Sequence, residues 1–463
     1  MGLKLGGKVE KVNGKELAYS EFIENYLKKN QPVILTGLTD DWRACKDWVS
    51  GEGMPNLRYF SDHFGGSIVQ VADCVTREFT DQKRVEMSVS EFIEQWINIS
   101  SSDNGGADGK PLLYLKDWHF VKEYPDYVAY STPVFFLDDW LNLYLDMYHM
   151  HDDPDSYQER NDVNCSDYRF VYMGAKGTWT PLHADVFRSY SWSANVCGRK
   201  QWYFLCPSQH HLVFDRYMKS AVYDIFEDVC KLKYPGFEEA IWWECTQEQN
   251  EIIFVPSGWY HQVHNLEDTI SINHNWFNAC NISWVWDLLL REYHEAAGYI
   301  EDLKDICDDF EGLCQRNLAA NAGMEFRDFF IFMIRFALAN FVLLYQLTSS
   351  KVINCSSSEM AELLLFNLRN IKCITLKMKS EAAWQNCGIV VIDLVETIED
   401  QSFMEFCNTL GRTYSKIYKF NHSQPLLEHE QISVLYPFGS HICNPDNLIT
   451  FLDYVFELVG TKG

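Results

Sequence analysis

The chain has 463 residues, of which 47% are hydrophobic and 15% aromatic, so it can form two or three domains with a large buried core. This composition excludes intrinsically disordered, collagen-like and low-complexity proteins. The formal charge of −26 repels phosphate backbones and attracts basic partners. We therefore expect no direct nucleic-acid partner. A basic protein partner fits this charge, and so does an acidic surface that only keeps the protein soluble.

Cysteine usage and the N-terminal residues indicate a reducing compartment. The 15 cysteines include no CxxC pair, and MGLKLGGKVEKVNGKEL contains no apolar stretch like that of a signal peptide. We therefore expect a cytoplasmic protein, with the nucleus as the alternative. The one long apolar run, residues 329–347, is interrupted by Arg335 and Asn340 and is only marginally long enough to span a bilayer. This run predicts a buried helix, and no membrane association is expected.

Helix and strand patterns follow one another along the first part of the chain. Residues 19–29 have apolar side chains at helical spacing and lead into the strand-like run PVILTGL. A second pair follows, with a helical pattern at 89–99 and the strand-like run PLLYLKDW. From residue 168 to 278 the pattern changes to short apolar runs between turn signals, which indicates a sandwich or barrel. These runs are YRFVYMG, SYSWSANVCG, KQWYFLCP, EIIFVPSG and TISINHNW.

After residue 278 helical patterns return. Asn281 or Ser283 can cap one helix, and a second is predicted around residues 324–347. The sequence thus predicts a mixed α/β protein in three segments. Residues 1–164 form a helix and strand flank that packs on the barrel, 165–280 form the β core, and 281–463 are mainly helical.

The β region contains a candidate metal site. In TPLHAD, strand periodicity places His183 and Asp185 on one face, and His261 follows the turn VPSGWY 76 residues after Asp185. Two neutral imidazoles and one carboxylate can occupy one face of an octahedral ion and leave three positions open, as in non-haem Fe(II) oxygenases. A His and an Asp two residues apart are common by chance, and the same three ligands fit a zinc hydrolase or a manganese cupin.

Lys200 favours an oxygenase among these alternatives. It enters the strand-like run KQWYFL directly after a glycine turn, where the simplest interpretation is a charge on an edge strand. A 2-oxoglutarate oxygenase, however, needs a deep cation for the distal carboxylate of its cosubstrate, and a buried lysine is suited to this. Thr180 and Tyr114 are candidate hydroxyl donors to that carboxylate, with ordinary strand packing as the alternative for each.

Together these residues identify a resemblance. The chain resembles the jumonji-C 2-oxoglutarate oxygenases, and within them the jumonji domain-containing protein 4 lysyl hydroxylase group, over most of its first 280 residues. The resemblance implies a double-stranded β-helix (cupin-like jelly-roll) core that binds Fe(II) through His183, Asp185 and His261 and 2-oxoglutarate through Lys200. The segments that carry it are NQPVILTGLTDDW, LLYLKDWHF, DYRFVYMG, TWTPLHADVFRSYSWSANVCGRKQWYFLCP and IIFVPSGWYHQVHNLEDTISINHNWFN.

The resemblance also implies further cosubstrate contacts. Thr180 and Tyr114 fall where related enzymes hydrogen-bond the cosubstrate. Asn273 or Asn275 falls where another polar contact is made, and the spacing does not choose between these two. Related enzymes often carry an asparagine between the HxD motif and the lysine, and Asn195 is the substitute that this sequence offers.

The family divides into N-methyl-lysine demethylases and hydroxylases of protein side chains. Both consume 2-oxoglutarate and O₂ and release succinate and CO₂. The resemblance implies C4 hydroxylation of a lysine in the eukaryotic peptide-chain release factor, in support of translation termination. The absence of CxxC zinc modules favours a hydroxylase over a chromatin demethylase. A histone-type lysine demethylase and a non-catalytic β-barrel binding protein remain the alternatives.

Overall fold

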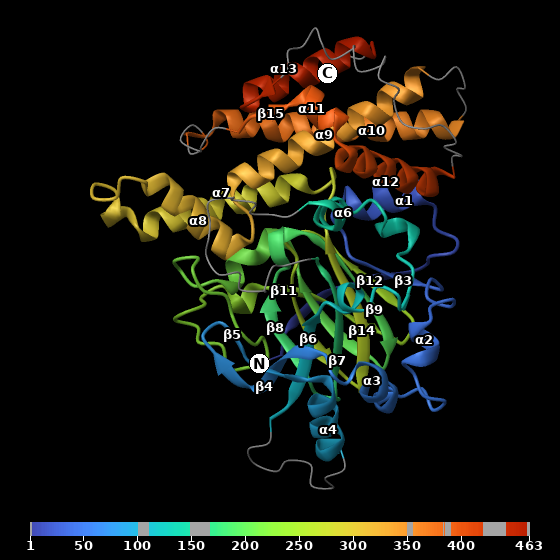
Figure 1. Cartoon of the computed structure of the whole chain (residues 1–463). Coiled ribbons are helices and arrows are strands. Elements are labelled where there is room, and N and C mark those ends of the chain that lie inside the picture. The colour runs from blue at the N-terminus through green and yellow to red at the C-terminus, as the bar shows by residue number, and fades with distance from the viewer. Residues whose placement is uncertain are drawn as a thin grey trace. The chain divides into compact units, whose positions relative to one another are not determined.

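The computed structural model describes residues 2–100, 111–148, 167–349, 355–382, 384, 390–419 and 441–460. The chain forms two compact units, the first made of Met1–Pro133 and Asp167–Trp276, the second of Val134–Ser166 and Phe277–Gly463 (Figure 1). The three segments proposed from the sequence mark changes of sequence pattern, and their division stays a prediction.

The first unit contains two sheets. The smaller sheet has the strand order β1-β11-β10-β13-β8, and the larger has the order β2-β3-β12-β9-β14-β7-β6-β4-β5. All pairings are antiparallel except β1 with β11 and β2 with β3. The smaller sheet consists of β1 (Lys4–Lys8), β8 (Trp179–His183), β10 (Lys200–Leu205), β11 (Ile241–Gln247) and β13 (Tyr260–Asn265). The larger consists of β2 (Glu10–Asn13), β3 (Val33–Thr36), β4 (Ile68–Glu78), β5 (Asp81–Ser88), β6 (Leu113–Trp118), β7 (Arg169–Gly174), β9 (Tyr190–Cys197), β12 (Ile252–Val255) and β14 (Thr269–Trp276).

Eight consecutive strands, β7 to β14, form the predicted barrel. The chain alternates between the sheets, except that β10 and β11 are neighbours in the same sheet. As a result β12, β9, β14 and β7 adjoin in the larger sheet, and β11, β10, β13 and β8 adjoin in the smaller one. This alternation is the topology of a double-stranded β-helix, in which each sheet presents one face to a shared interior. The larger sheet then extends past β7 through β6, β4 and β5, so the N-terminal flank is continuous with the barrel.

Short helices accompany the sheets of the first unit. The expected helix at 19–29 is present as α1 (Tyr19–Phe22) and a π-helical turn (Ile23–Leu27), and that at 89–99 is α4 (Val89–Ser100). The other helices are α2 (Ala44–Asp47), α3 (Leu57–Phe64) and α5 (Phe120–Glu123), with 3₁₀ turns at Val186–Arg188, Pro207–Val213 and Phe237–Glu239. The sequence did not reveal the β4–β5 hairpin, because the second half of β4 is exposed and β5, in which Gln82 is the one buried residue, has no apolar alternation.

Aromatic and β-branched side chains fill the space between the sheets. Every residue of β9 is buried, as expected for a central strand that is covered on both faces. One core cluster joins the smaller sheet to the larger, with Trp202 and Phe204 of β10 packed near Ile253 and Val255 of β12. The rings of Trp202 and Phe204 are stacked with centroids 5.6 Å apart. This packing fixes the strands that carry the candidate site residues.

The second unit is helical, as predicted for the C-terminal part of the chain. Its helices are α6 (Trp140–Met147), α7 (Ile282–Tyr299), α8 (Phe310–Ala322), α9 (Phe326–Ser349), α10 (Cys355–Ser380), α11 (Leu394–Glu399), α12 (Gln401–Tyr418) and α13 (Pro445–Leu458), with 3₁₀ turns at Val134–Phe136 and Glu301–Leu303. A small two-stranded pairing joins β15 (Ile392–Asp393) to β16 (His441–Ile442).

Helix α9 is the buried helix expected from the apolar run. Its Phe326–Thr348 stretch is long and apolar enough to cross a membrane, but 78% of its most apolar window is buried inside the protein. Phe336 of α9 stacks on Trp140 of α6 with ring centroids 4.3 Å apart. The polar Asn340 accepts a hydrogen bond from Asn367 of α10 at 2.9 Å and donates to the Phe336 carbonyl. Burial with paired polar groups is what a core helix requires.

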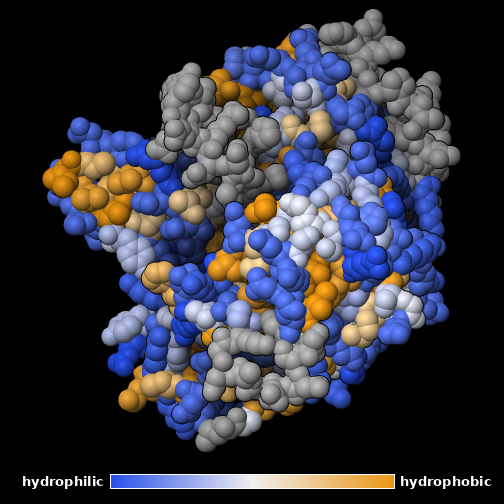
Figure 2. All heavy atoms as spheres, turned by 60° about the horizontal axis from the view of Figure 1, so that its bottom comes forward, coloured by the Kyte–Doolittle hydropathy of each residue, from blue (hydrophilic) through white to orange (hydrophobic). Residues whose placement is uncertain are grey.

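The surface view agrees with the acidic composition. In Figure 2 hydrophilic residues cover most of the visible face, and hydrophobic residues form separate groups between them. Exposed large apolar side chains are spread along the described chain. They include Val75, Phe79, Val128, Tyr217, Leu232, Tyr299 and Ile306. Apolar groups scattered in this way are normal for a protein surface.

A glycine turn leads into the strand of Lys200, and it generates a stability prediction. Gly198 has φ +75°, and a Cβ built there would lie 2.1 Å from the Asp268 carbonyl oxygen. Gly198→Ala should therefore lower the free energy of unfolding by about 2–4 kcal/mol, because strain and a backbone clash add. Urea unfolding followed by tryptophan fluorescence measures it. Gly177→Ala is the control, since φ is +91° there but the Cβ would meet only Leu112, at 3.9 Å. Equal losses in both variants would show that the clash is unimportant.

Candidate active site

Three potential metal ligands converge at one end of the barrel. His183 ends β8, Asp185 follows two residues later, and His261 lies near the start of β13. One ligand atom from each lies within 4.8 Å of the others. His183 and His261 are opposite each other in the antiparallel β8–β13 pair, and their ring centroids are 4.3 Å apart. The spacing predicted from the sequence thus brings all three residues to one point.

Backbone carbonyls set the orientation of both imidazoles. Nδ1 of His183 lies 2.8 Å from the Pro181 carbonyl oxygen, and Nδ1 of His261 lies 3.0 Å from that of Trp259. A carbonyl oxygen only accepts hydrogen bonds, so each Nδ1 carries the proton and each Nε2 keeps a free lone pair. Burial, followed by repulsion from His261, lowers the pKa of His183. The His183 ring therefore favours the neutral form that a metal needs.

Asp185 is placed by a strained turn rather than by strand periodicity. It lies just beyond the end of β8, before the 3₁₀ turn Val186–Arg188. The strand predicted to carry both His183 and Asp185 ends at His183, so strand alternation does not place Asp185. Phe187 and Arg188 in that turn have φ of 54° and 51°. Left-handed backbone at two successive non-glycine residues is strained and is maintained by surrounding contacts. Arg188 donates to the Tyr260 hydroxyl at 2.9 Å, which supplies one such contact.

Lys200 lies at the opposite end of a polar interior. It is 2% exposed, and its ammonium donates to Ser271 Oγ at 2.7 Å and to the Tyr114 hydroxyl oxygen at 3.3 Å. Because β10 pairs with β11 on one side and β13 on the other, Lys200 is not an edge-strand charge. Both hydroxyls accept from the lysine, so their own O–H groups point to other acceptors. Three donors thus gather at one point, as a carboxylate requires.

The charge of Lys200 has no counter-ion within the described part of the chain. Burial, followed by the positive charge of Lys116, lowers its pKa to about 7. A buried ammonium without a carboxylate beside it is costly unless a ligand supplies the negative charge. This donor set therefore fits the distal carboxylate of 2-oxoglutarate, and the histidine and aspartate ligands fit Fe(II).

The other predicted cosubstrate residues occupy different places. Asn273 donates to Ser271 Oγ at 3.1 Å and so joins the Lys200 network, whereas Asn275 donates to Ser189 Oγ at 3.3 Å, beyond the Asp185 turn. Of the two asparagines that the spacing could not separate, Asn273 is the one linked to Lys200. Asn195 donates to the Gly198 carbonyl and holds the turn before Lys200. Thr180 is half-buried opposite Val263 of β13.

Sequence reasoning missed two hydroxyls of this interior. Ser271, fully buried, accepts from Lys200, and its place two residues before Asn273 in TISINHNW was the available signal. Ser191 donates to Asp185 Oδ2 at 2.7 Å. The sequence showed only that Ser191 shares a strand face with Asn195. Its bond to Asp185 depends on the turn between them and has no sequence signature.

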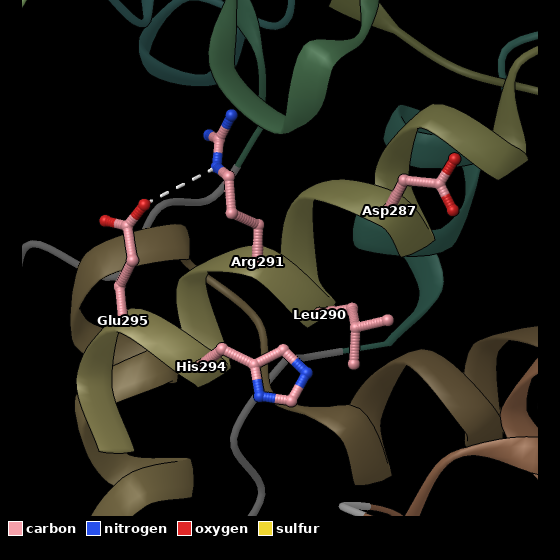
Figure 3. A pocket seen from close by; sticks show the side chains of 5 residues that line it. All are labelled: Asp287, Leu290, Arg291, His294 and Glu295. Atoms are coloured by element: carbon pink, nitrogen blue, oxygen red, sulfur yellow. Dashed lines mark ion pairs between the residues drawn. The ribbon is translucent and has the colours of Figure 1, made fainter. Parts of the chain in front are cut away.

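A separate pocket of about 470 Å³ lies on α7, in the second unit. Figure 3 shows its five labelled side chains on this one helix, with Arg291 paired to Glu295 at 3.8 Å. Asp287 is likewise paired, with Lys377 at 3.0 Å. The pocket is open and its charges are neutralised by neighbours, so it lacks the buried unpaired groups of the barrel interior. Its lining residues are Asp287, Leu290, Arg291, His294 and Glu295.

Comparison with known proteins agrees with this geometry. The family described as "Cupin-like domain" matches residues 19–282. The chain is 43% identical over 323 residues to the 2-oxoglutarate and iron-dependent oxygenase JMJD4 of Danio rerio, covering 69% of this chain and 72% of that protein. The chain belongs to the cupin-like jumonji-C oxygenases. As a member of this family it is an iron- and 2-oxoglutarate-dependent dioxygenase, which confirms the predicted cofactors and excludes a non-catalytic barrel.

Two further jumonji-C relatives differ in the chemistry that their names state. The arginine-specific demethylase JMJ20 of Arabidopsis thaliana is 58% identical over 458 residues, 98% of each chain. The bifunctional arginine demethylase and lysyl-hydroxylase psr-1 of Caenorhabditis elegans is 25% identical over 301 residues, 60% of this chain and 63% of that protein. Jumonji-C relatives of this chain thus act on lysine and on arginine side chains of proteins.

The hydrogen bond from Ser191 generates a prediction on metal affinity. Ser191→Ala should weaken Fe(II) or Mn(II) binding about 10- to 100-fold, because groups that orient a metal ligand contribute that much. Mn(II) titration followed by electron paramagnetic resonance measures it. Ser208→Ala is the control, because among the described residues that exposed hydroxyl hydrogen-bonds only to Cys206. An unchanged affinity in Ser191→Ala would show that the strained turn alone orients Asp185.

The lowered pKa of Lys200 generates a prediction on pH dependence. A bound carboxylate stabilises the ammonium and raises this pKa above its free value of about 7. Binding then takes up a proton above pH 7, so 2-oxoglutarate affinity should fall as pH rises from 7 to 9, by up to about tenfold per pH unit for one proton. Equilibrium dialysis with the Mn(II)-loaded protein measures it. If the 2-oxoglutarate affinity of the wild-type protein does not change with pH, and Lys200→Met behaves in the same way, Lys200 does not contact the cosubstrate.

Proposed function

We propose that the protein hydroxylates C4 of a lysine in the eukaryotic peptide-chain release factor that recognises stop codons, and so supports translation termination. The observation that carries this proposal is the set of His183, Asp185, His261 and Lys200 within a chain similar to JMJD4 over more than two-thirds of its length. The resemblance of the chain to the jumonji domain-containing protein 4 group supports a lysine of the release factor as the substrate. Since termination takes place on cytoplasmic ribosomes, we place the enzyme in the cytosol.

The residues of the barrel divide the work of this reaction. His183, Asp185 and His261 would hold Fe(II), while Lys200, Tyr114 and Ser271 would hold the distal carboxylate of 2-oxoglutarate. When bound, iron and cosubstrate activate O₂, and one oxygen atom enters a substrate C–H bond while the other enters succinate. The buried side chains around these residues would exclude water and position the C–H bond that reacts.

The charge of the protein supports a basic protein substrate. The formal charge of −26 steers positively charged partners toward the surface over about 8 Å at physiological ionic strength. This long-range attraction favours a substrate lysine presented in a basic segment.

A second candidate function is demethylation of N-methyl-arginine. The relative JMJ20, which is similar over 98% of both chains and named an arginine-specific demethylase, favours it. Oxidation of an N-methyl carbon gives a carbinolamine that breaks down to formaldehyde and the unmethylated nitrogen. The same metal site can perform either reaction, because the C–H bond placed nearest the iron decides the product. The names of JMJ20 and psr-1 state arginine, and not methyl-lysine, as the demethylated residue.

One experiment separates the two functions. The purified protein is incubated with Fe(II), ascorbate, 2-oxoglutarate and either the release factor or a panel of methyl-arginine peptides. We expect a single-oxygen gain on one release-factor lysine by peptide mass mapping, absent in Asp185→Ala and retained in the exposed-site control Asp228→Ala. Formaldehyde from the peptides without oxygen gain on the release factor would favour the arginine demethylase. Succinate formation with neither product would remove both substrates and keep the oxygenase.

A further inference from the structure

A second lysine lies buried in the same interior as Lys200. Tyr114 and Lys116 are two residues apart in β6, so their side chains lie on the same face of the sheet. Lys116 is 3% exposed, and its ammonium lies 5.2 Å from the centroid of the Tyr114 ring. The hydroxyl of the same tyrosine contacts Lys200. One tyrosine thus meets two buried ammonium groups, one at its face and one at its hydroxyl.

The contacts of Lys116 leave its charge uncompensated. Its ammonium donates to Gln82 Oε1 at 2.8 Å, and Gln82 Nε2 donates to the Trp179 carbonyl at 3.0 Å. The neighbouring carboxylate of Asp117 is engaged by Arg84 at 2.7 Å and by the Tyr172 hydroxyl at 2.6 Å. Within the described residues, no carboxylate forms an ion pair with Lys116. Its remaining N–H groups can therefore serve a ligand.

Burying the charge of Lys116 costs more free energy than its hydrogen bond to Gln82 can return. Burial is the main cause that lowers its pKa to about 8, and the positive charge of Arg84 adds to this, while Cys74, Asp81 and Asp117 act in the opposite direction. Lys116 in turn lowers the pKa of Lys200. Burying two mutually repelling ammonium groups in one interior is costly, and a neutral side chain could hydrogen-bond Gln82 equally well. An anion that contacts both would offset this cost.

The strand register places Lys116 toward the metal site. On β14 the direction from Ser271 to Asn275 leads toward the Asp185 turn, since Asn275 bonds Ser189. β7 is antiparallel to β14 and β6 is antiparallel to β7, so β6 runs the same way as β14, from Tyr114 toward Trp118. Lys116 is therefore displaced from Tyr114 toward the end of the barrel that holds His183 and Asp185.

We propose that Lys116 is a second cationic contact for the cosubstrate and binds the carboxylate of its 2-oxo acid end, while Lys200 binds the distal carboxylate. The two lysines then match a dianion at both ends. This inference rests on the proposed location of 2-oxoglutarate beside Lys200. It assigns a ligand-contacting role to a residue outside the metal site and the Lys200 network.

The test compares metal binding with cosubstrate binding in the full-length protein. Lys116→Gln removes the charge and keeps a partner for Gln82. We expect 2-oxoglutarate affinity of the Mn(II)-loaded variant to fall at least roughly tenfold, as for loss of a buried charged contact. Mn(II) affinity without 2-oxoglutarate should stay equal or rise, because a repelling cation near the ligands is gone. A parallel loss of both affinities would show a merely structural role and overturn the proposal.

Two matched variants separate charge from packing. Gln82→Leu removes the hydrogen bond of Lys116 but keeps its charge, and should retain 2-oxoglutarate affinity within about threefold, well under the loss from removing the charge. Lys122→Met removes an exposed lysine of α5 and should change nothing. If Gln82→Leu loses as much 2-oxoglutarate affinity as Lys116→Gln, the loss comes from the hydrogen bonds that link Lys116 through Gln82 to β8, and the proposal is wrong.

Two further measurements distinguish this inference from its premise. Lys200→Met should abolish tight 2-oxoglutarate binding, and full affinity in that variant would contradict the cosubstrate location itself. If Lys200→Met loses affinity and Lys116→Gln does not, only the role of Lys116 is refuted. The probe 2-oxobutanoate has a 2-oxo acid end but no distal carboxylate, so Lys116→Gln should weaken it as well. A loss confined to 2-oxoglutarate would contradict the assignment to the 2-oxo acid end.

Discussion

The cost of keeping positive charge inside a protein is the constraint on which this barrel depends. Lys200 and Lys116 are both buried, and within the described residues neither has a carboxylate partner. Folding must therefore supply enough packing energy elsewhere to hold two ammonium groups away from water. The aromatic cluster between β10 and β12, with Trp202 stacked on Phe204, provides rigid walls for this purpose. The fold and the ligand are thus linked, because a bound dicarboxylate offsets the cost of burying the two ammonium groups.

The metal site uses the backbone in the same way on two strands. Each histidine bonds a carbonyl two residues earlier, Pro181 for His183 and Trp259 for His261. Because both acceptors belong to the main chain, the tautomer of each ring is set by the strand geometry itself. Asp185 has no such support and relies on Ser191 and on the strained turn that follows it. The carboxylate is therefore the ligand whose position depends most on side-chain contacts.

Local motifs made much of this predictable from sequence. The metal ligands and Lys200 lie in compact segments whose residue types already state their chemistry, and the short apolar runs of the barrel carry clear turn signals. The β4–β5 hairpin could not be found in this way, because it joins the sheet through the pairing of β4 with β6, and β5 is a mostly charged and polar edge strand. Because this strand pairing has no sequence signature, the hydrogen bond between Lys116 and Gln82 could not be predicted either. The choice between Asn273 and Asn275 needed the register of β14, since both point to the same face.

The turn after Asp185 shows how stability and activity oppose each other in this protein. Phe187 is 2% exposed and packs edge-on against Tyr168, with ring centroids 5.5 Å apart, while its backbone occupies a region that glycine enters freely. A bulky ring at such a position means that its packing outweighs the conformational penalty. Directed evolution for heat tolerance would be drawn to relax this turn, and each step in that direction would loosen the carboxylate beside it. The most thermostable descendants of this enzyme would then be those that hold their metal least well.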